Sequence, residues 1–407
     1  MKSKALVSAI LAKIYGIGKC QRNFFAHLVI LIFQIRGRLN FIQMGRYGIY
    51  NELTYRENFK KAFDFQLFNR TLIQSQGSGH YIVTFDPSHI KKSGSKTFGV
   101  GYFWSGCDSK IKRGLEFGGF AVCDIDNHTA FHLEGFQTPN KAQLAEKGQN
   151  LLAHYSELWI KEAENLSEFS AYGVVDAYFS KITFIEPVCT QTSLHIISRL
   201  RDDAVLYYLY TGLPTGKAGK PRQFDGKVVA KTPNLSYFTC VHKDKELCIY
   251  EAVVYAKALK RKVKLALTQY FDDKGKVKCT KLYFCTDINL GGWYIVKYYK
   301  NRFQQEFLYR DGNQFTGLED CQARSKEKLH YHLNTALTAV SVAKAAHYLP
   351  LSVEKRKTFS MASVKVLYHN ELLLEKFISV FGISPELAYK NPNIDQIIKF
   401  GLIDQNI

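Results

Sequence analysis

The chain has 407 residues, which is enough for two or three domains with a sizeable core. Its 55 lysines and arginines outnumber 36 acidic residues, so the formal net charge is +19, and that charge favours a polyanionic partner, nucleic acid before an anionic membrane surface. The nine scattered cysteines contain no C-x2-C pair, which argues against a zinc-ribbon or disulfide-stapled class and indicates a reduced, cytosolic protein.

Residues 1–78 are predicted to form a helical region in which basic residues separate apolar runs. The longest run, residues 24–35, contains His27 and Gln34 and is too short to span a bilayer. Lys13 interrupts the first apolar stretch and no small-residue cleavage site follows it, so we expect no secretory signal.

Residues 79–204 alternate strand and helix patterns. A strand at residues 81–85 ends at Asp86, and three further strands are predicted near 98–104, 115–122 and 130–135. A long amphipathic helix over 141–166 precedes a strand at 171–175 that ends at Asp176, and after a short helix another strand covers 194–200. Antiparallel strands followed by helix, strand, helix and strand is the order of a ribonuclease H-like α/β core.

Residues 205–290 contain short strand patterns separated by turn clusters and are predicted to form an all-β insertion domain. Residues 291–350 then return to the core with two helices: one carries Tyr299 to Arg310, and the other covers 326–348. Residues 351–407 are predicted to form a helical C-terminal region. The expected organisation is therefore a ribonuclease H-like core interrupted by a β-rich insertion and flanked by helical regions.

Three carboxylates are the candidate catalytic residues. Asp86 and Asp176 each follow a buried strand, and Glu306 would come from a helix packed against the same sheet. Three carboxylates without sulfur or imidazole form a hard, oxygen-rich site that suits Mg²⁺ or Mn²⁺. We expect two such ions, which would activate the nucleophile and stabilise the leaving oxygen of a phosphodiester.

The spacing Y-x2-R-x3-E places Tyr299, Arg302 and Glu306 on one face of a straight helix. Each candidate has a plainer interpretation: the helix face is solvated charge, and each aspartate is a turn or cap residue. Asp124 and Asp126 compete for the metal role, although their place before Asn127 favours a turn.

In this order, the motifs resemble those of bacterial insertion-sequence DDE transposases of family four, which carry the signature Y-x2-R-x3-E-x6-K. Three segments carry the resemblance, which covers roughly residues 36 to 345: F-D-P-S-H-I-K-K-S-G at 85–94, V-V-D-A-Y at 174–178, and Y-Y-K-N-R at 298–302 followed by Glu306. The predicted β-rich insertion falls where this family carries its insertion domain.

The resemblance implies a cut-and-paste DNA transposase, with a hairpin intermediate in many members. Asp86, Asp176 and Glu306 would hold the metal ions, while Tyr299 and Arg302 would contact DNA near the cleaved phosphate. One departure is plain, because the final lysine of the signature is Asn313 in this chain. A neutral amide replaces a cationic phosphate contact there, and Arg310, about one turn earlier, is the nearest candidate to compensate.

Further DNA contacts are predicted at two basic clusters. Lys91 and Lys92 follow Asp86 closely enough to reach the DNA backbone, with a solvated loop as the alternative. Lys260, Arg261 and Lys262 form a backbone-binding patch in the insertion, with a polar sheet edge as the alternative. Tyr283 or Trp293 would stack on a flipped base in one interpretation, and core packing is the preferred one.

The expected partners are double-stranded DNA with terminal inverted repeats, a target DNA and a second copy of the chain in the synaptic complex. The expected location is the bacterial cytoplasm, at the nucleoid. Two alternatives stay open: a weakened or domesticated DNA-binding derivative of such an enzyme, and a ribonuclease H-like nuclease that performs no strand transfer.

Overall fold

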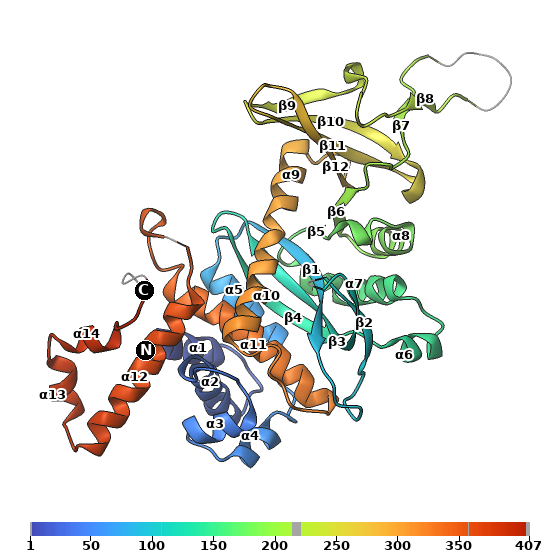
Figure 1. Cartoon of the computed structure of the whole chain (residues 1–407). Helices are drawn as coiled ribbons and strands as arrows, with labels where there is room; N and C mark the ends of the chain where they lie inside the picture. The colour runs from blue at the N-terminus through green and yellow to red at the C-terminus, as the bar shows by residue number, and fades with distance from the viewer. Residues whose placement is uncertain (1, 107, 214–220, 357, 404–407) are drawn as a thin grey trace. The chain divides into compact units, whose positions relative to one another are not determined.

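The computed structural model describes residues 2–106, 108–213, 221–356 and 358–403 (Figure 1). These residues form a mixed α/β structure with twelve strands, most of them paired antiparallel. The chain divides into two compact units. Unit 1 comprises Met1–Gly79, Pro87–Lys141 and Gln305–Ile407, and unit 2 comprises His80–Asp86 and Ala142–Gln304.

Unit 1 begins with the expected helical region. Its helices are α1 (Lys2–Ala12), α2 (Lys19–Gln34), α3 (Phe41–Tyr47), α4 (Glu52–Asn58) and α5 (Phe65–Gln76). Asn40, Asn51 and Asp64 cap α3, α4 and α5, because each side chain accepts a hydrogen bond from a backbone N–H of the first turn. Helix α2 supplies much of the core, with Phe25, Leu28, Leu31 and Phe33 fully buried.

The strands of unit 1 are the end of β1 (Tyr81–Lys91), then β2 (Gly101–Ser105), β3 (Lys110–Asp124) and β4 (Thr129–Gln137). Strand β3 pairs antiparallel with β2 and β4. Helix α11 (Lys326–His347) packs on β4 through Asn334, whose side chain accepts from Gly135 N at 2.8 Å and donates to Gly135 O at 3.1 Å. Helix α10 (Phe303–Phe315) docks on β3 where Gln305 donates to the Gly119 carbonyl at 2.8 Å.

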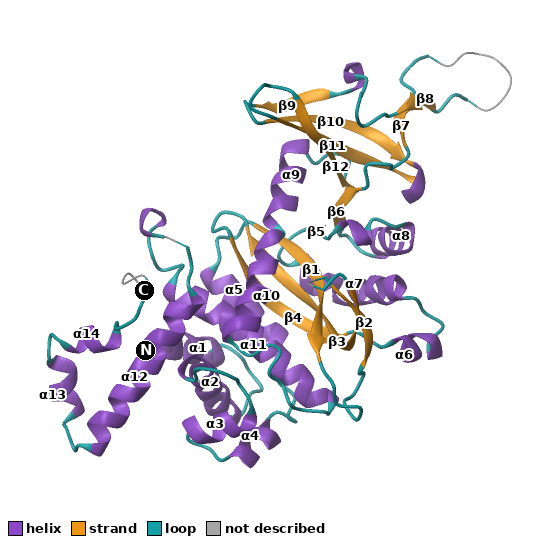
Figure 2. Ribbon diagram, in the orientation of Figure 1, coloured by secondary structure: helices purple, strands orange, loops and turns teal. Residues whose placement is uncertain are grey.

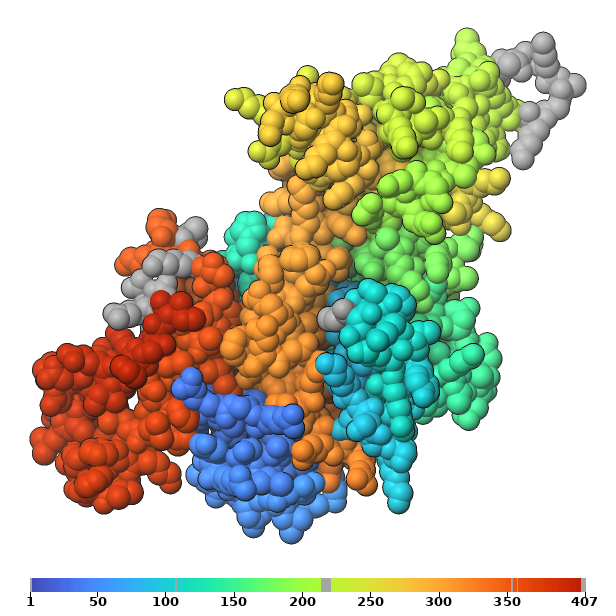
Figure 3. Space-filling view, viewed as in Figure 1, coloured from blue at the N-terminus to red at the C-terminus, as the bar shows by residue number. Residues whose placement is uncertain are grey.

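Unit 1 ends with α12 (Met361–Val380), α13 (Pro385–Lys390) and α14 (Ile394–Ile398), as expected for a helical C-terminal region. In Figure 3 these helices lie at the surface of the face shown. Phe377, Phe381 and Leu387 are among their exposed apolar side chains.

Unit 2 contains both parallel and antiparallel strand pairs. The start of β1 pairs parallel with β5 (Tyr172–Val174), which pairs parallel with β6 (His195–Leu200). From β6 the order continues through antiparallel pairs. The remaining strands are β7 (Leu206–Leu209), β8 (Phe224–Lys227), β9 (Thr239–Lys243), β10 (Leu247–Ala256), β11 (Arg261–Phe271) and β12 (Val277–Cys285).

Between β7 and β12 the described residues form strands, turns and two short 3-10 helices (Figure 2). They include no α-helix within the ranges 206–213 and 221–285. The short strand patterns expected over residues 205–290 correspond to β7 to β12. The β character of the stretch was thus correctly predicted.

The helices of unit 2 are α6 (Lys141–Glu146), α7 (Leu151–Ser167), α8 (Ile182–Gln191) and α9 (Gly292–Asn301). Phe85 of β1 packs against Tyr155 and Trp159 of α7, with ring centroids 5.3 Å and 6.3 Å away. Trp159 is fully buried and lies against the Cα of Gly173 in β5, since a Cβ there would meet its ring at 2.4 Å. This apolar layer fixes the strands that carry Asp86 and Asp176.

Two expectations about element boundaries were wrong. The single helix over 141–166 is two helices, because Gly148 takes a left-handed φ of 63° and Asn150 then caps α7 by accepting from Ala153 N. The first strand does not end at Asp86 but continues to Lys91 through Pro87. Pro87 is tolerated there because the pairing with β5 stops at Thr84, so no ladder bond to β5 is lost.

The eight cysteines among the described residues are unpaired thiols, and Cys107 lies outside those residues. No helix of the described chain combines the length and the apolar character needed to cross a membrane.

Candidate active site

Asp86 and Asp176 occupy equivalent positions on two adjacent parallel strands of unit 2. The register of β1 and β5 pairs Val83 with Gly173 and Thr84 with Val174. The pairing ends at Thr84 and Val174, so Asp86 and Asp176 each lie two residues past the last paired residue of their strand, at the same end of the β1–β5 pair. Both side chains are partly exposed.

The backbone of Asp176 is held in place from three directions. Val175 N donates to Ile197 O at 3.1 Å, and the buried Ser198 hydroxyl donates to Asp176 O at 2.8 Å. The Asp176 side chain caps a 3-10 turn (Ala177–Phe179), accepting from Tyr178 N through Oδ1 at 2.8 Å. The plain interpretation of Asp176 as a cap residue is therefore correct. A further ligand on Oδ2 would not require breaking that cap.

Arg199 and Tyr283 lie beside Asp176 on the same sheet. The β5–β6 register pairs Val174 with Ile197, so it extends to Asp176 opposite Arg199, and the β6–β12 register pairs Arg199 directly with Tyr283. The Nε atom of Arg199 is buried and makes no hydrogen bond. This face thus contains an acid, a base and a phenol on three neighbouring strands.

Tyr299 of helix α9 covers this group of side chains. Its ring lies 4.9 Å from the ring of Tyr283, and the Arg302 guanidinium lies 5.7 Å from the centre of the Tyr299 ring. Burial raises the pKa of Tyr299, while Arg302 and Arg199 lower it and Asp176 raises it. Tyr299 therefore feels the charges of Asp176, Arg199 and Arg302, and the predicted DNA contact of Tyr299 and Arg302 stays a prediction.

The start of helix α9 is anchored to the β10–β11 pair. Glu251 of β10 accepts a hydrogen bond from Gly292 N at 2.5 Å and pairs with Lys264 of β11 at 3.3 Å. A carboxylate at a helix N-terminus also interacts favourably with the helix dipole. The strands of the β-rich stretch thereby position the helix that presents Tyr299.

The expectation of one straight helix from Tyr299 to Glu306 was wrong. Helix α9 ends at Asn301 and α10 begins at Phe303, with Arg302 between them. The buried Asn301 side chain donates to Lys297 O at 2.9 Å and so competes with the backbone ladder at that point. Arg302 itself keeps right-handed helical backbone angles, and its N–H donates to Tyr298 O at 3.2 Å, so Tyr299 and Arg302 stay on adjacent helical positions across this interruption.

Glu306, Arg310 and Asn313 belong to helix α10 and, by the division of the chain, to unit 1. Glu306 is partly exposed and Asn313 is exposed. The half-exposed Arg310 pairs with Asp311 at 3.1 Å and lies 4.8 Å above the Phe307 ring. The helix continues past Gly312, where a close approach of Leu337 leaves only 2.9 Å for a Cβ.

The other predicted DNA-contacting residues differ in their freedom to bind. Lys91 is exposed, but the Lys92 ammonium donates to the Cys321 carbonyl, and burial lowers the pKa of Lys92. Lys260 is exposed in the connection between β10 and β11, Lys262 is exposed near the start of β11, and Arg261 is partly exposed between them. Lys92 thus has a structural contact in unit 1, whereas the cluster in unit 2 faces solvent.

Tyr283 and Trp293 have different environments. Tyr283 is buried, and burial raises its pKa, so the preferred interpretation of core packing is correct for this residue. Trp293 is 41% exposed and stacks on His242 with ring centroids 4.5 Å apart. Core packing was the wrong interpretation for Trp293, because its helix presents it to solvent beside β9.

Asp124 has the turn role predicted for it. The fully buried carboxylate accepts from Ser78 N, the Ser78 hydroxyl, Asn127 N and the Asn127 amide at 2.7 to 3.0 Å. Within the described ranges, no three His, Cys, Asp or Glu side chains form a group that could hold a metal ion. The metal-binding role of Asp86, Asp176 and Glu306 stays a prediction.

Sequence reasoning missed Arg199 and Ser198. A usable signal existed for Arg199, because it is the cation within the strand pattern that follows Asp176. Tyr283 was named only as a base-stacking or core residue, and its pairing with Arg199 could not be predicted, since it joins strands more than eighty residues apart. No protein-family model and no curated protein matches this chain.

Proposed function

We propose that the chain is a DNA transposase that cleaves and joins DNA strands at transposon ends by a metal-dependent, cut-and-paste reaction. The observation that carries the proposal is the placement of Asp86 and Asp176 at the same end of two adjacent parallel strands, each two residues past the last paired residue. The finer fold proposed with it is a ribonuclease H-like core with an all-β insertion between β6 and α9. The parallel β1–β5–β6 order and the strands from β7 to β12 support this.

Asp86, Asp176 and Glu306 would hold Mg²⁺ or Mn²⁺, which in the bound state would polarise the scissile phosphodiester and activate a water or a 3′-hydroxyl. The donor set fits this metal class because it consists of carboxylates. The assignment of Glu306 rests on the Y-x2-R-x3-E spacing, whereas the two aspartates are supported by strand register as well.

Arg302 and Tyr299 are proposed to position the DNA strand. A guanidinium forms paired hydrogen bonds with phosphate oxygens, and the Tyr299 ring beside Arg302 restricts where that guanidinium can lie. Arg199 adds a second cation beside Asp176. Together these groups can balance the charge of a phosphodiester brought next to two carboxylates.

The test is cleavage and strand transfer of a duplex carrying the inverted repeats that flank the coding sequence. Asp86→Asn, Asp176→Asn and Glu306→Gln should each lower the Mg²⁺-dependent rate by about a thousandfold, the equivalent of about 4 kcal/mol. DNA binding should be retained. The matched control is Asp126→Asn, an exposed aspartate in the turn after β3, which should leave the rate unchanged.

Near-normal cleavage by any of the three variants would show that the substituted residue is not one of the catalytic carboxylates. Cleavage without joining of a 3′-hydroxyl end to a second duplex would favour the nuclease alternative. Binding without cleavage in the unaltered chain would favour the DNA-binding derivative. Asn313→Lys restores the lysine of the family signature on the exposed face of α10. A large gain in activity would indicate that this chain has lost a phosphate contact, and no gain would indicate that the site works without it.

A further inference from the structure

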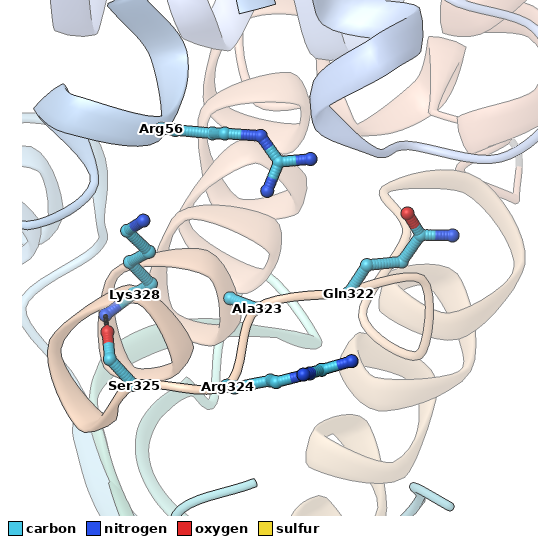
Figure 4. A pocket seen from close by; sticks show the side chains of 6 residues that line it. All are labelled: Arg56, Gln322, Ala323, Arg324, Ser325 and Lys328. Carbon is cyan, nitrogen blue, oxygen red and sulfur yellow. Dashed lines mark hydrogen bonds between the residues drawn. The ribbon is translucent and has the colours of Figure 1, made fainter. Parts of the chain in front are cut away.

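Two hollows of unit 1 adjoin along the segment that leads into helix α11. The first, about 570 Å³, is lined by Arg56, Gln322, Ala323, Arg324, Ser325 and Lys328 (Figure 4). The second, about 630 Å³, includes Arg38, Lys91, Lys92, Glu319 and Asp320 in its lining. Gln322 and Arg324 line both hollows, so the two form one surface, which we call the 319–328 track.

Cations dominate this track. The two linings contain six of them, Arg38, Arg56, Lys91, Lys92, Arg324 and Lys328, against two carboxylates, Glu319 and Asp320. Asp320 is engaged within the protein, since its Oδ2 accepts from Leu39 N at 2.8 Å. The buried Cys321 and His332 form a hydrogen-bonded pair beneath the track, which lowers the pKa of Cys321 and raises that of His332.

Several of these cations are oriented by their own surroundings. Glu52 accepts from Nε of Arg56 at 2.7 Å, and the Arg56 guanidinium lies 4.8 Å above the Phe41 ring. The segment itself is anchored, because Phe98 N donates to Arg324 O at 2.8 Å and Lys92 donates to Cys321 O. The side chains of Arg324, Arg38 and Lys91 are exposed. The track is therefore a fixed backbone carrying outward-facing cations.

We propose that the 319–328 track binds the phosphodiester backbone of duplex DNA without reading its sequence. The cations are distributed over two adjoining hollows, which suits a row of phosphates better than one isolated phosphate. The first hollow also opens at the N-terminus of the 22-residue helix α11, whose dipole favours an anion. The inference rests on the proposed DNA partner but not on the proposed metal chemistry. Loss of cleavage in the carboxylate variants and loss of DNA binding in the variants of this track are therefore separate outcomes.

The test measures binding of the full chain to a fluorescent 20-base-pair duplex of scrambled sequence, in EDTA and over a series of KCl concentrations. Each phosphate contact contributes about 0.9 to the slope of log K against log salt. The double variant Arg324→Gln with Lys328→Gln should therefore reduce that slope by about 1.8 and weaken binding severalfold at low salt. Arg324→Lys, which keeps the charge, should retain the slope.

The matched control is Lys274→Gln with Lys276→Gln, which removes the same charge from an exposed turn between β11 and β12 in unit 2. An equal loss of slope in this control would overturn the proposal, because total charge would then explain the effect. An unchanged slope in the track variant would also overturn it. Circular dichroism confirms that each variant is folded, and Lys91→Gln provides an independent variant of the same track.

Two further arms distinguish other ligands. An RNA duplex that binds more tightly than DNA, with the same loss in the track variant, would overturn the assignment to DNA. Competition by inorganic phosphate at micromolar concentration would indicate a site for a free anion and would overturn the assignment to a polymer backbone. Binding to duplex DNA that is at least as tight as to duplex RNA, and that inorganic phosphate does not compete away, supports the assignment to a DNA backbone.

Discussion

Units 1 and 2 use polar side chains in different ways. In unit 1 the polar groups at the sheet–helix interface are buried and partnered: Asn334, fully buried, bonds Gly135, His132 and His330. In unit 2, Asp86 and Asp176 stand in partly exposed positions, and an apolar layer on Trp159 holds their strands. Asp176 caps a turn through Tyr178 N, and Arg199 pairs with Asp202 at 3.5 Å. The buried polar contacts of unit 1 thus contrast with partly exposed polar contacts at the predicted site of unit 2.

The largest expected effect concerns the apolar layer of unit 2. Trp159→Ala should destabilise the chain by about 3–5 kcal/mol, because it removes a fully buried side chain beneath β1 and β5. Urea unfolding followed by circular dichroism measures the change. The matched control, Trp293→Ala, removes a 41% exposed tryptophan of the same unit and should cost less than about 1 kcal/mol. Equal costs would contradict the view that this layer holds the aspartate-bearing strands.

The second prediction concerns the polar interface of unit 1. Asn334→Leu should cost about 2–4 kcal/mol, since it leaves the N–H and carbonyl of Gly135 without their side-chain partner in a buried place. The same unfolding measurement applies. Gln314→Leu, on the exposed face of α10, is the control and should change stability by about 0.5 kcal/mol or less. A tolerated Asn334→Leu would show that unit 1 does not depend on this hydrogen-bonded residue.

The third prediction is a dependence of unit 1 on pH through two buried lysines. Burial lowers the pKa of Lys365 to about 7 and that of Lys344 to about 8, from an ordinary value of 10.5. Between the lowered and ordinary values the unfolded chain holds a proton that the folded chain lacks. Stability should therefore rise with pH across that window, by at most about 1.4 kcal/mol per pH unit for each group.

The measurement is the urea midpoint between pH 7 and 9, below the range in which tyrosines ionise. Lys365→Met should flatten the rise, because it removes the titrating group whose ammonium donates to Ile32 O at 2.6 Å. Lys376→Met, an exposed lysine of the same helix, should leave the rise unchanged. Lys344 should keep part of the rise in this variant, so only an undiminished rise in Lys365→Met would exclude Lys365 as a source.

The smallest expected effect tests the electrostatic coupling in unit 2. Arg199 lowers the pKa of Tyr299, so Arg199→Gln should shift that pKa further upwards. Titration of the Tyr299 ring by carbon-13 NMR measures the shift. Arg201→Gln removes an exposed arginine two residues away and should leave the Tyr299 pKa unchanged. An unchanged Tyr299 pKa in the Arg199→Gln variant would show that Arg199 does not interact with Tyr299 at the candidate site.

Much of the secondary structure could be predicted from the sequence, because local patterns determine it. The helices of residues 1–76, helix α11 and the strands around Asp86 and Asp176 all have clear apolar periodicity. The helix boundaries that were predicted wrongly depend on the backbone conformation or side-chain hydrogen bonds of single residues. Gly148 with Asn150 divided one predicted helix, and the Asn301 side chain accompanies the interruption at Arg302.

The candidate site was only partly visible in the sequence. The ends of apolar strand patterns in the sequence singled out Asp86 and Asp176, although β1 itself continues to Lys91, and helical spacing linked Tyr299 with Arg302. Pairing between distant strands brought Arg199 next to Tyr283, and no local pattern records such a pairing. The 319–328 track was missed for the same reason, since its cations come from residues as far apart as Arg38 and Lys328.

The sequence by itself determined the net positive charge, the order of strands and helices, and the carboxylates available to bind a metal. These are local or additive properties, set by residue type and by spacing along the chain. Only the tertiary structure decided that Asp86 and Asp176 follow the same end of two paired strands, that Lys92 donates to the Cys321 carbonyl, and that Arg56 and Arg324 line one hollow. Such relations depend on long-range packing, because they join residues that the chain separates and the fold brings together.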